Sequence, residues 1–131
     1  MSIEELKILV IEDYKPMQLV LKHQLCKLGI KNIQCALSHT EGWTALTETA
    51  YDVIISDWGE PNTFCAKDTF SEMGNLRPGK PPHFILMVET LNESVKKEAQ
   101  DTGIYTFLEK PFTVEDIRTL LEAQTNIKMV G

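Results

Sequence analysis

The chain has 131 residues, of which 43% are hydrophobic and 24% charged, a composition that predicts one ordinary globular domain. Its 13 basic and 19 acidic residues give a net charge of −6, and the basic residues are scattered, so we expect neither direct nucleic-acid binding nor membrane insertion. The start of the chain lacks a secretory pattern, and three cysteines without a CxxC motif indicate neither a disulfide framework nor a zinc site. These features predict a cytoplasmic location.

Five short segments rich in aliphatic, β-branched or aromatic residues predict buried strands. In chain order they are Lys7–Ile11, Ile30–Ala36, Asp52–Ser56, Phe84–Val88 and Tyr105–Leu108. The second segment is more polar than the others, which places it nearer an edge of the sheet.

A helical pattern follows each predicted strand. The helices are expected over residues 16–28, 38–47, 67–76, 92–100 and 113–123, with a frayed tail after about Ala123. Residues that favour helix starts mark four of them, namely Pro16, Ser38 with Glu41, Asn92, and Thr113 with Asp116. The apolar face expected for the first helix consists of Met17, Val20, Leu21, Leu25 and Leu28. The three histidines, His23, His39 and His83, are dispersed, and we expect surface or capping roles for them.

Strands that alternate with helices predict a doubly wound α/β fold with a parallel sheet covered on both faces. Ligands of such folds bind beyond the carboxyl ends of the strands. The residues just past four of the predicted strands are Glu12–Asp13, Asp57, Glu89–Thr90 and Lys110. We therefore expect several carboxylates and one lysine at one edge of the sheet.

Carboxylates that crowd together repel one another unless a cation lies between them. Magnesium suits such a site because it binds one or two carboxylates and keeps several waters. A salt-bridged strand rim is the simpler alternative, but it does not easily explain acids at the ends of two buried strands. A flavin or dinucleotide site would need a glycine-rich or hydroxyl-rich loop after the first strand, where Glu12–Asp13 stands. A P-loop and a GxSxG motif are absent from the sequence. An aspartate that takes a phosphoryl group through a bound metal is an attractive alternative to these functions.

From Lys7 to Ala123 the sequence resembles the receiver domains of response regulators, of the chemotaxis (CheY-like) type. The motifs that carry this resemblance are Leu9-Val10-Ile11-Glu12-Asp13, Ile55-Ser56-Asp57-Trp58 with Pro61-Asn62, and Lys110-Pro111-Phe112. The resemblance implies a flavodoxin-like fold of five βα units with strand order 2-1-3-4-5. It also implies that residues 1–131 form a single receiver domain with a core over about residues 7–123, and that the Lys110–Pro111 bond is cis.

The resemblance implies a role for each residue of the acidic edge. Asp57 would be the phosphoacceptor, with a sensor histidine kinase or a histidine phosphotransfer protein as its donor. Asp13, Asp57 and the carbonyl of Gly59 would bind magnesium or manganese, and Glu12 would act through water. Lys110 would be the catalytic lysine that binds the phosphoryl oxygen. Such a protein is no classical enzyme, although it catalyses its own phosphorylation and dephosphorylation.

The sequence departs from the family's pattern at the switch that reports phosphorylation. Glu89 stands where the family has Ser or Thr after the fourth strand, and Thr90 follows it, so either residue could fill the switch position. The aromatic residue of the switch falls at Phe107, with Tyr105 on the same strand face by alternation. Thr63-Phe64-Cys65 replaces the family's Asp-Gly, and we expect Phe64 and Cys65 to be packing residues.

Three functions fit these residues. The first is a phosphorylatable switch that contacts a downstream protein through the fourth helix, fifth strand and fifth helix, which carry Val95, Tyr105, Phe107 and Arg118. The second is a pseudo-receiver, a binding module that phosphorylation does not switch because of Glu89. The third, a metal-dependent phosphatase, fits least well because Gly59 stands where that chemistry usually has a second acid.

Overall fold

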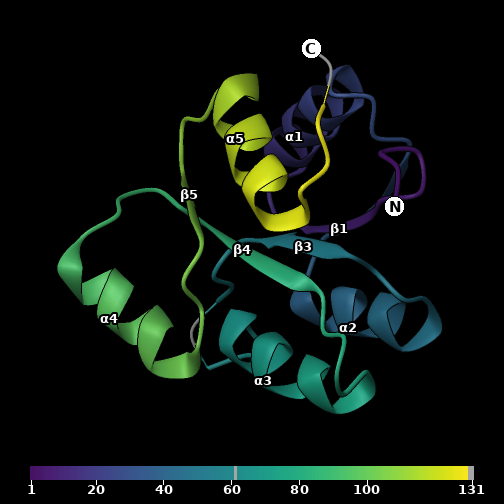
Figure 1. Ribbon diagram of the computed structural model, residues 1–131. Helices are drawn as coiled ribbons and strands as arrows, with labels where there is room; N and C mark the ends of the chain where they lie inside the picture. Colours follow the sequence, from purple (N-terminus) through teal and green to yellow (C-terminus); the bar gives the residue numbers. More distant parts are fainter. Residues whose placement is uncertain (61, 130–131) are drawn as a thin grey trace.

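The computed structural model describes residues 1–60 and 62–129, so Pro61 of the expected motif lies outside the described residues. The chain forms one parallel sheet of five strands in the order β2-β1-β3-β4-β5, which confirms the predicted doubly wound topology (Figure 1). The strands are β1 Lys7–Ile11, β2 Asn32–Ala36, β3 Val53–Ser56, β4 His83–Val88 and β5 Phe107–Glu109. The helices are α1 Lys15–Lys27, α2 His39–Glu48, α3 Ala66–Leu76, α4 Glu93–Thr102 and α5 Val114–Thr125.

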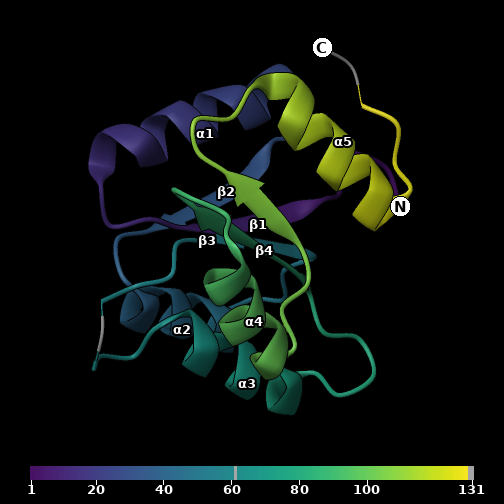
Figure 2. The same cartoon turned by 90° about the vertical axis from the view of Figure 1, so that its left-hand side faces the viewer.

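Helices cover both faces of the sheet, with α1 and α5 on one face and α2, α3 and α4 on the other (Figures 1 and 2). Strand β1 shows why its sequence is a continuous apolar run. Ile8 and Val10 pack into the core beneath α1 and α5, whereas Leu9 and Ile11 pack into the core on the opposite face. The residues from Ile8 to Ile11 are thus buried whichever face they point to, as expected for a parallel sheet between two helical layers.

Side-chain caps confirm three of the four predicted helix starts, and Pro16 lies in the first turn of α1 as predicted. Asn92 accepts a hydrogen bond from the backbone N–H of Val95 at 2.9 Å. Thr113 and Asp116 form a reciprocal capping box, in which each side chain accepts from the other residue's backbone N–H. Ser38 likewise accepts from the N–H of Glu41. These caps satisfy backbone donors that a helix leaves unpaired in its first turn.

Most element bounds shift by one or two residues, and helix α1 and strand β5 differ from the predictions in other ways. Val20 was expected in the inward face of α1, but it is 48% exposed, whereas Gln18 is buried. Gln18 points inward because its side-chain amide donates to the carbonyl oxygen of Ala36, at the end of β2, at 3.0 Å. The fifth strand begins at Phe107 rather than Tyr105, because its pairing with β4 begins with Phe107 opposite Leu86. Tyr105 therefore precedes the strand and is 69% exposed.

The expectation of a frayed tail after Ala123 is wrong for the residues described. Helix α5 continues to Thr125, and Asn126 then turns the chain with a left-handed backbone, φ 60°. Met129 returns to the core and is 8% exposed, and its backbone N–H donates to Glu122 at 2.7 Å. This contact and the apolar burial of Met129 hold the segment against the domain. Within the described residues, no helix is both long and apolar enough to cross a membrane.

Candidate functional site

The register of the parallel strands brings the predicted site residues to one edge of the sheet. Ile11 of β1 lies opposite Ser56 of β3, so Glu12 and Asp57 leave their strands side by side. The N–H of Asp57 extends the ladder by donating to the carbonyl of Ile11 at 2.9 Å. On the far side of β3, the N–H of Lys110 continues the pairing of β5 with β4.

Three carboxylates meet at this edge, as predicted. One oxygen each from Glu12, Asp13 and Asp57 lies within 4.8 Å of the other two. Glu12 is buried, Asp57 is half-buried and Asp13 is exposed, so the cluster runs from the interior to the surface. The backbone N–H of Asp13 also donates to Oδ2 of Asp57 at 3.1 Å. A compact set of carboxylate oxygens that reaches solvent could hold a hard divalent cation.

Lys110 lies at the inner end of this cluster. Its Nζ donates to Oε1 of Glu12 at 2.8 Å, and both side chains are mostly buried. Burial raises the pKa of the Glu12 carboxyl above its ordinary value, and the hydrogen bond from Lys110 acts in the opposite direction. The Lys110–Pro111 peptide bond is cis, as the resemblance implied.

A cleft of about 520 Å³ opens over the acids. Six acidic residues and a single basic residue, Lys110, are among the described residues that line it. The acidic ones are Glu12, Asp13, Asp57, Glu60, Glu89 and Glu98. Electrostatic repulsion among these carboxylates favours a cation or a protonated group in the cleft.

Both candidates for the switch position line this cleft. Glu89 and Thr90 follow β4 and are exposed, so both lie where a group bound at Asp57 could meet them. The next residue, Leu91, is tied to β5, because its N–H donates to the carboxylate of Glu109 at 2.8 Å. The turn after β4 is thus anchored just beyond the two candidates, and neither is favoured over the other.

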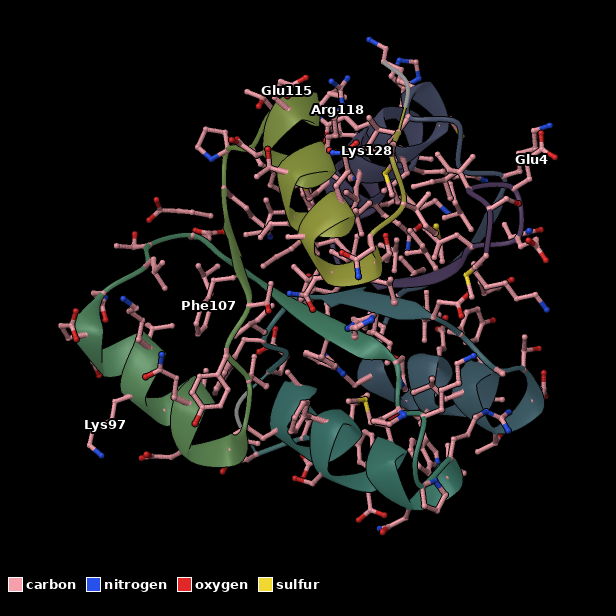
Figure 3. The ribbon with its side chains drawn as sticks, viewed as in Figure 1. Glu4, Lys97, Phe107, Glu115, Arg118 and Lys128 are labelled. Atoms are coloured by element: carbon pink, nitrogen blue, oxygen red, sulfur yellow. The ribbon has the colours of Figure 1, made fainter. Side chains whose placement is uncertain are left out.

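Of the remaining predicted switch residues, Phe107 begins β5 and Tyr105 lies just before it. Phe107 is half-buried and packs on the core beneath α3 and α4, and Figure 3 shows it beside β5 on the side of α4. Tyr105 lies before the strand with its side chain in solvent. Val95 packs on the same core as Phe107. Arg118, on α5, forms an ion pair with Glu115 at 2.7 Å (Figure 3).

His39 is the functional candidate that the sequence analysis missed. A surface or capping role was expected, and it holds for the exposed His23 and His83, but His39 is only 3% exposed. Its Nε2 lies 3.1 Å from Oδ1 of Asp57. A usable signal was present, because His39 follows the second predicted strand by three residues and so belongs to the same edge of the sheet as Asp57.

Gly59 makes room for this histidine. Its φ of +91° is in the left-handed region, where side chains other than glycine are strained. A methyl group at Gly59 would lie 2.9 Å from Cβ of Cys65 and 3.1 Å from Cδ2 of His39. Cys65 is buried, and the ring of Phe64 packs near Trp43 with ring centroids 6.0 Å apart and the ring planes tilted by 57°, so both are packing residues as predicted. Gly59 itself lines the cleft, as the predicted ligand role requires.

A flavodoxin-like doubly wound sheet with acids after β1 and β3 and a lysine after β5 defines the class of two-component signalling receivers. Residues 8–122 match the response regulator receiver domain family, and the chain belongs to this family. It is thus a receiver domain of the two-component type, and its cluster of Glu12, Asp13 and Asp57 is consistent with a phosphorylation site.

The relatives agree with this assignment. A probable chemotaxis protein CheY of Rhizobium etli is 29% identical over 123 residues, which are 92% of this chain and 92% of that protein. A response regulator receiver domain protein of Clostridium thermocellum is 27% identical and superposes with a TM-score of 0.78, over 92% of this chain and 94% of that chain. The receiver domain of the sensor histidine kinase PA1611 of Pseudomonas aeruginosa, solved with a magnesium ion coordinated in its active-site cleft, is 19% identical with a TM-score of 0.79, over 91% and 96% of the two chains.

Proposed function

We propose that Asp57 accepts a phosphoryl group from a phosphohistidine and that the phosphorylated protein signals by contact with another protein. The observation that carries this proposal is the convergence of three carboxylates within 4.8 Å at the edge of the sheet, with Lys110 bonded to the innermost one. In the reaction, an oxygen of Asp57 attacks phosphorus, and the bond between phosphorus and the donor nitrogen breaks with its electron pair going to nitrogen. An anionic nucleophile and an anionic donor repel each other, so the site must supply positive charge.

The residues present fit a magnesium or manganese ion. Asp13 and Asp57 would be direct ligands with the carbonyl of Gly59, and Glu12 would act through water. The ion, when bound, would neutralise the acids and the phosphoryl oxygens. Lys110 has three N–H donors, so it can bind a phosphoryl oxygen in addition to Glu12 or in its place. The resemblance to receiver domains implies magnesium or manganese, and the cluster of carboxylate oxygens supports binding of a hard divalent cation.

The partners follow from this chemistry. Receiver domains in general interact with histidine kinases or phosphotransfer proteins, and we assign the donor of this chain to those classes. We place the downstream contact on α4, β5 and α5, with Val95 on α4, Tyr105 just before β5, Phe107 on β5 and Arg118 on α5, and we place the switch at Glu89 or Thr90. The three cysteines are free, which suits a reducing compartment such as the cytoplasm.

Phosphorylation is tested by incubating the protein with magnesium and acetyl phosphate and measuring its intact mass. We expect the mass of one phosphoryl group to be added to the wild type and to Asp101→Asn, which makes the same change at an exposed aspartate of α4. Asp57→Asn should show no adduct. An adduct that survives in Asp57→Asn would contradict the assignment of the acceptor. No adduct on the wild type would contradict the proposed function and favour an unswitched binding module, and repeated turnover of a phosphate ester would favour a phosphatase.

Metal binding is tested separately by tryptophan fluorescence. Trp58 lines the cleft and Trp43 does not, so Trp43→Phe leaves a single reporter. We expect a saturable change on magnesium addition, and at least about a tenfold weaker apparent affinity after Asp13→Asn, because a direct carboxylate ligand is lost. Equal magnesium affinity of the Trp43→Phe protein with and without Asp13→Asn would exclude Asp13 as a ligand.

A further inference from the structure

The buried imidazole of His39 is surrounded at Nε2 by oxygen atoms. Oδ1 of Asp57, the backbone carbonyl oxygen of Asp57 and Oγ of Ser56 each lie 3.1 Å away. The two Asp57 oxygens can only accept a hydrogen bond, and the Ser56 hydroxyl already donates to the Asp57 carbonyl at 2.6 Å. Nε2 must therefore carry a proton, which it shares among these acceptors.

The other ring nitrogen anchors the imidazole. Nδ1 lies 2.8 Å from the hydroxyl of Thr69, which is fully buried on α3. With Nδ1 bonded to α3 and Nε2 directed at the end of β3, the ring is held between two elements. An imidazole fixed in this way is a preorganised hydrogen-bond donor to Asp57.

His39 is not among the described residues that line the main cleft. It lines a second hollow of about 230 Å³, which adjoins the main cleft because Asp13, Asp57, Gly59 and Glu60 line both. The donor therefore leaves the approach to Asp57 from the main cleft open. It also acts on the carboxylate independently of Lys110, which is bonded to Glu12.

We infer that His39 shortens the lifetime of the aspartyl phosphate by stabilising the carboxylate that Asp57 regains when the phosphoryl group leaves. This inference rests on the proposed function. In hydrolysis, a water oxygen bonds to phosphorus, and the bond between phosphorus and the Asp57 oxygen breaks with its electron pair going to the carboxylate. The water proton leaves to solvent or phosphate, and the Nε2–H of His39 keeps its own proton throughout.

The direction of the effect follows from the charge of the acceptor. A hydrogen bond to a carboxylate is roughly twice as strong as one to a neutral carbonyl or ester oxygen. Asp57 carries carboxylate charge before phosphorylation and after hydrolysis, but not while it forms the acyl phosphate. His39 thus favours the unphosphorylated state, and the charge that develops as the phosphorus–oxygen bond breaks makes its contribution grow along the reaction.

The test compares the decay of the aspartyl phosphate in the wild type, His39→Leu and His39→Gln. Each protein is phosphorylated with acetyl phosphate and magnesium, freed of donor, and followed by intact mass. Loss of the charge-assisted bond should slow decay about five- to tenfold in His39→Leu. His39→Gln, whose amide N–H can replace Nε2–H, should decay at nearly the wild-type rate. A leucine variant that decays as fast as the wild type, or a glutamine variant as slow as the leucine variant, would overturn the inference.

A measurement on the wild type covers the case in which His39→Leu does not fold. The ring nitrogens of ¹⁵N-labelled protein report by NMR which nitrogen is protonated. We expect the proton of His39 on Nε2, with its resonance moving to lower frequency on phosphorylation as the bond to Asp57 weakens. A ring protonated at Nδ1 alone, or an Nε2–H resonance that phosphorylation does not move, would overturn the inference. Failure of the wild type to form any adduct would instead count against the proposed function.

Discussion

Nζ of Lys110 lies 2.8 Å from Oε1 of Glu12, although 98 positions separate the two residues in the chain. The contact connects the end of β5 with the end of β1, across the intervening strands β3 and β4. Glu12 is 1% exposed, the most buried of the three clustered acids, so the lysine compensates the carboxylate that water reaches least. The pair therefore has a structural role in addition to any role in phosphoryl transfer.

Substitution of Lys110 by methionine should destabilise the protein. It leaves Glu12 buried without its charged partner, and we expect a loss of about 1–3 kcal/mol in the free energy of unfolding. Urea denaturation measures this loss without any phosphodonor. Lys97→Met is the matched control, because the ion pair of Lys97 with Asp101 is exposed and should contribute about 0.5 kcal/mol or less. Equal losses in the two variants would show that the Lys110–Glu12 pair does not stabilise the fold.

Gly59 and Gly79 share the same backbone φ, so their alanine variants distinguish the cost of backbone strain from the cost of steric crowding around the added methyl group. Gly59 and Gly79 both have φ +91°, but no atom lies within 4 Å of a methyl group placed on Gly79. Gly79→Ala should cost about 1–2 kcal/mol for the left-handed backbone alone. Gly59→Ala should cost about 1–3 kcal/mol more, because its methyl group meets Cys65 and His39. Thermal unfolding of both variants checks this order, and a Gly79→Ala variant as unstable as Gly59→Ala would contradict it.

The start of α3 should show a specific dependence on pH. The Asp68 carboxylate accepts the backbone N–H of Cys65 at 2.9 Å, and this bond lowers the pKa of Asp68 below its ordinary value of 3.8. Because the folded pKa is depressed, the contribution of Asp68 to stability is fully present above pH 3.8 and is lost as the pH falls through the folded pKa. The stability difference between wild type and Asp68→Asn, measured by urea denaturation, should therefore shrink in acid. A difference that stays constant or grows in acid would show that the cap does not favour the charged form.

Glu89 should slow the arrival of anionic phosphodonors. It adds one more negative charge to a cleft already lined by acids, and a like charge nearby costs about 0.5 to 1 kcal/mol in water-like surroundings. We expect Glu89→Gln to be phosphorylated by acetyl phosphate about two- to threefold faster at low salt, with the gain shrinking at high salt. Glu72→Gln, the same charge change on an exposed residue of α3 outside the cleft, should behave like the wild type. A salt-independent gain would point to a steric effect instead.

Much of the fold and of the acidic cluster could be predicted from sequence because both depend on local patterns. Each strand is a short apolar run, and caps such as Asn92 and Thr113 mark where helices begin. Parallel strands present their carboxyl ends at one edge, so Glu12 and Asp57 could be placed together without knowledge of any long-range contact.

What the sequence could not predict depends on contacts between distant residues. His39 is buried because Thr69, 30 positions away, bonds one ring nitrogen and because Gly59 leaves space beside the ring. Helical spacing alone places the apolar Val20 on the inward face of α1, but Gln18 is buried instead, because its side-chain amide donates a hydrogen bond to the carbonyl oxygen of Ala36 at the end of β2. The pattern of hydrophobic residues in the sequence predicts neither the burial of His39 nor that of Gln18.

The three-residue strand β5 is an edge strand, and Lys110 directly follows it, whereas the three clustered carboxylates follow β1 and β3. Short edge strands open locally more readily than the centre of a sheet. A ligand that needs Lys110 and the acids together binds only while β5 is docked, so by linkage its binding free energy also opposes this local opening. Binding of such a ligand should therefore slow amide hydrogen exchange in β5, which is distant in the chain from the proposed acceptor Asp57.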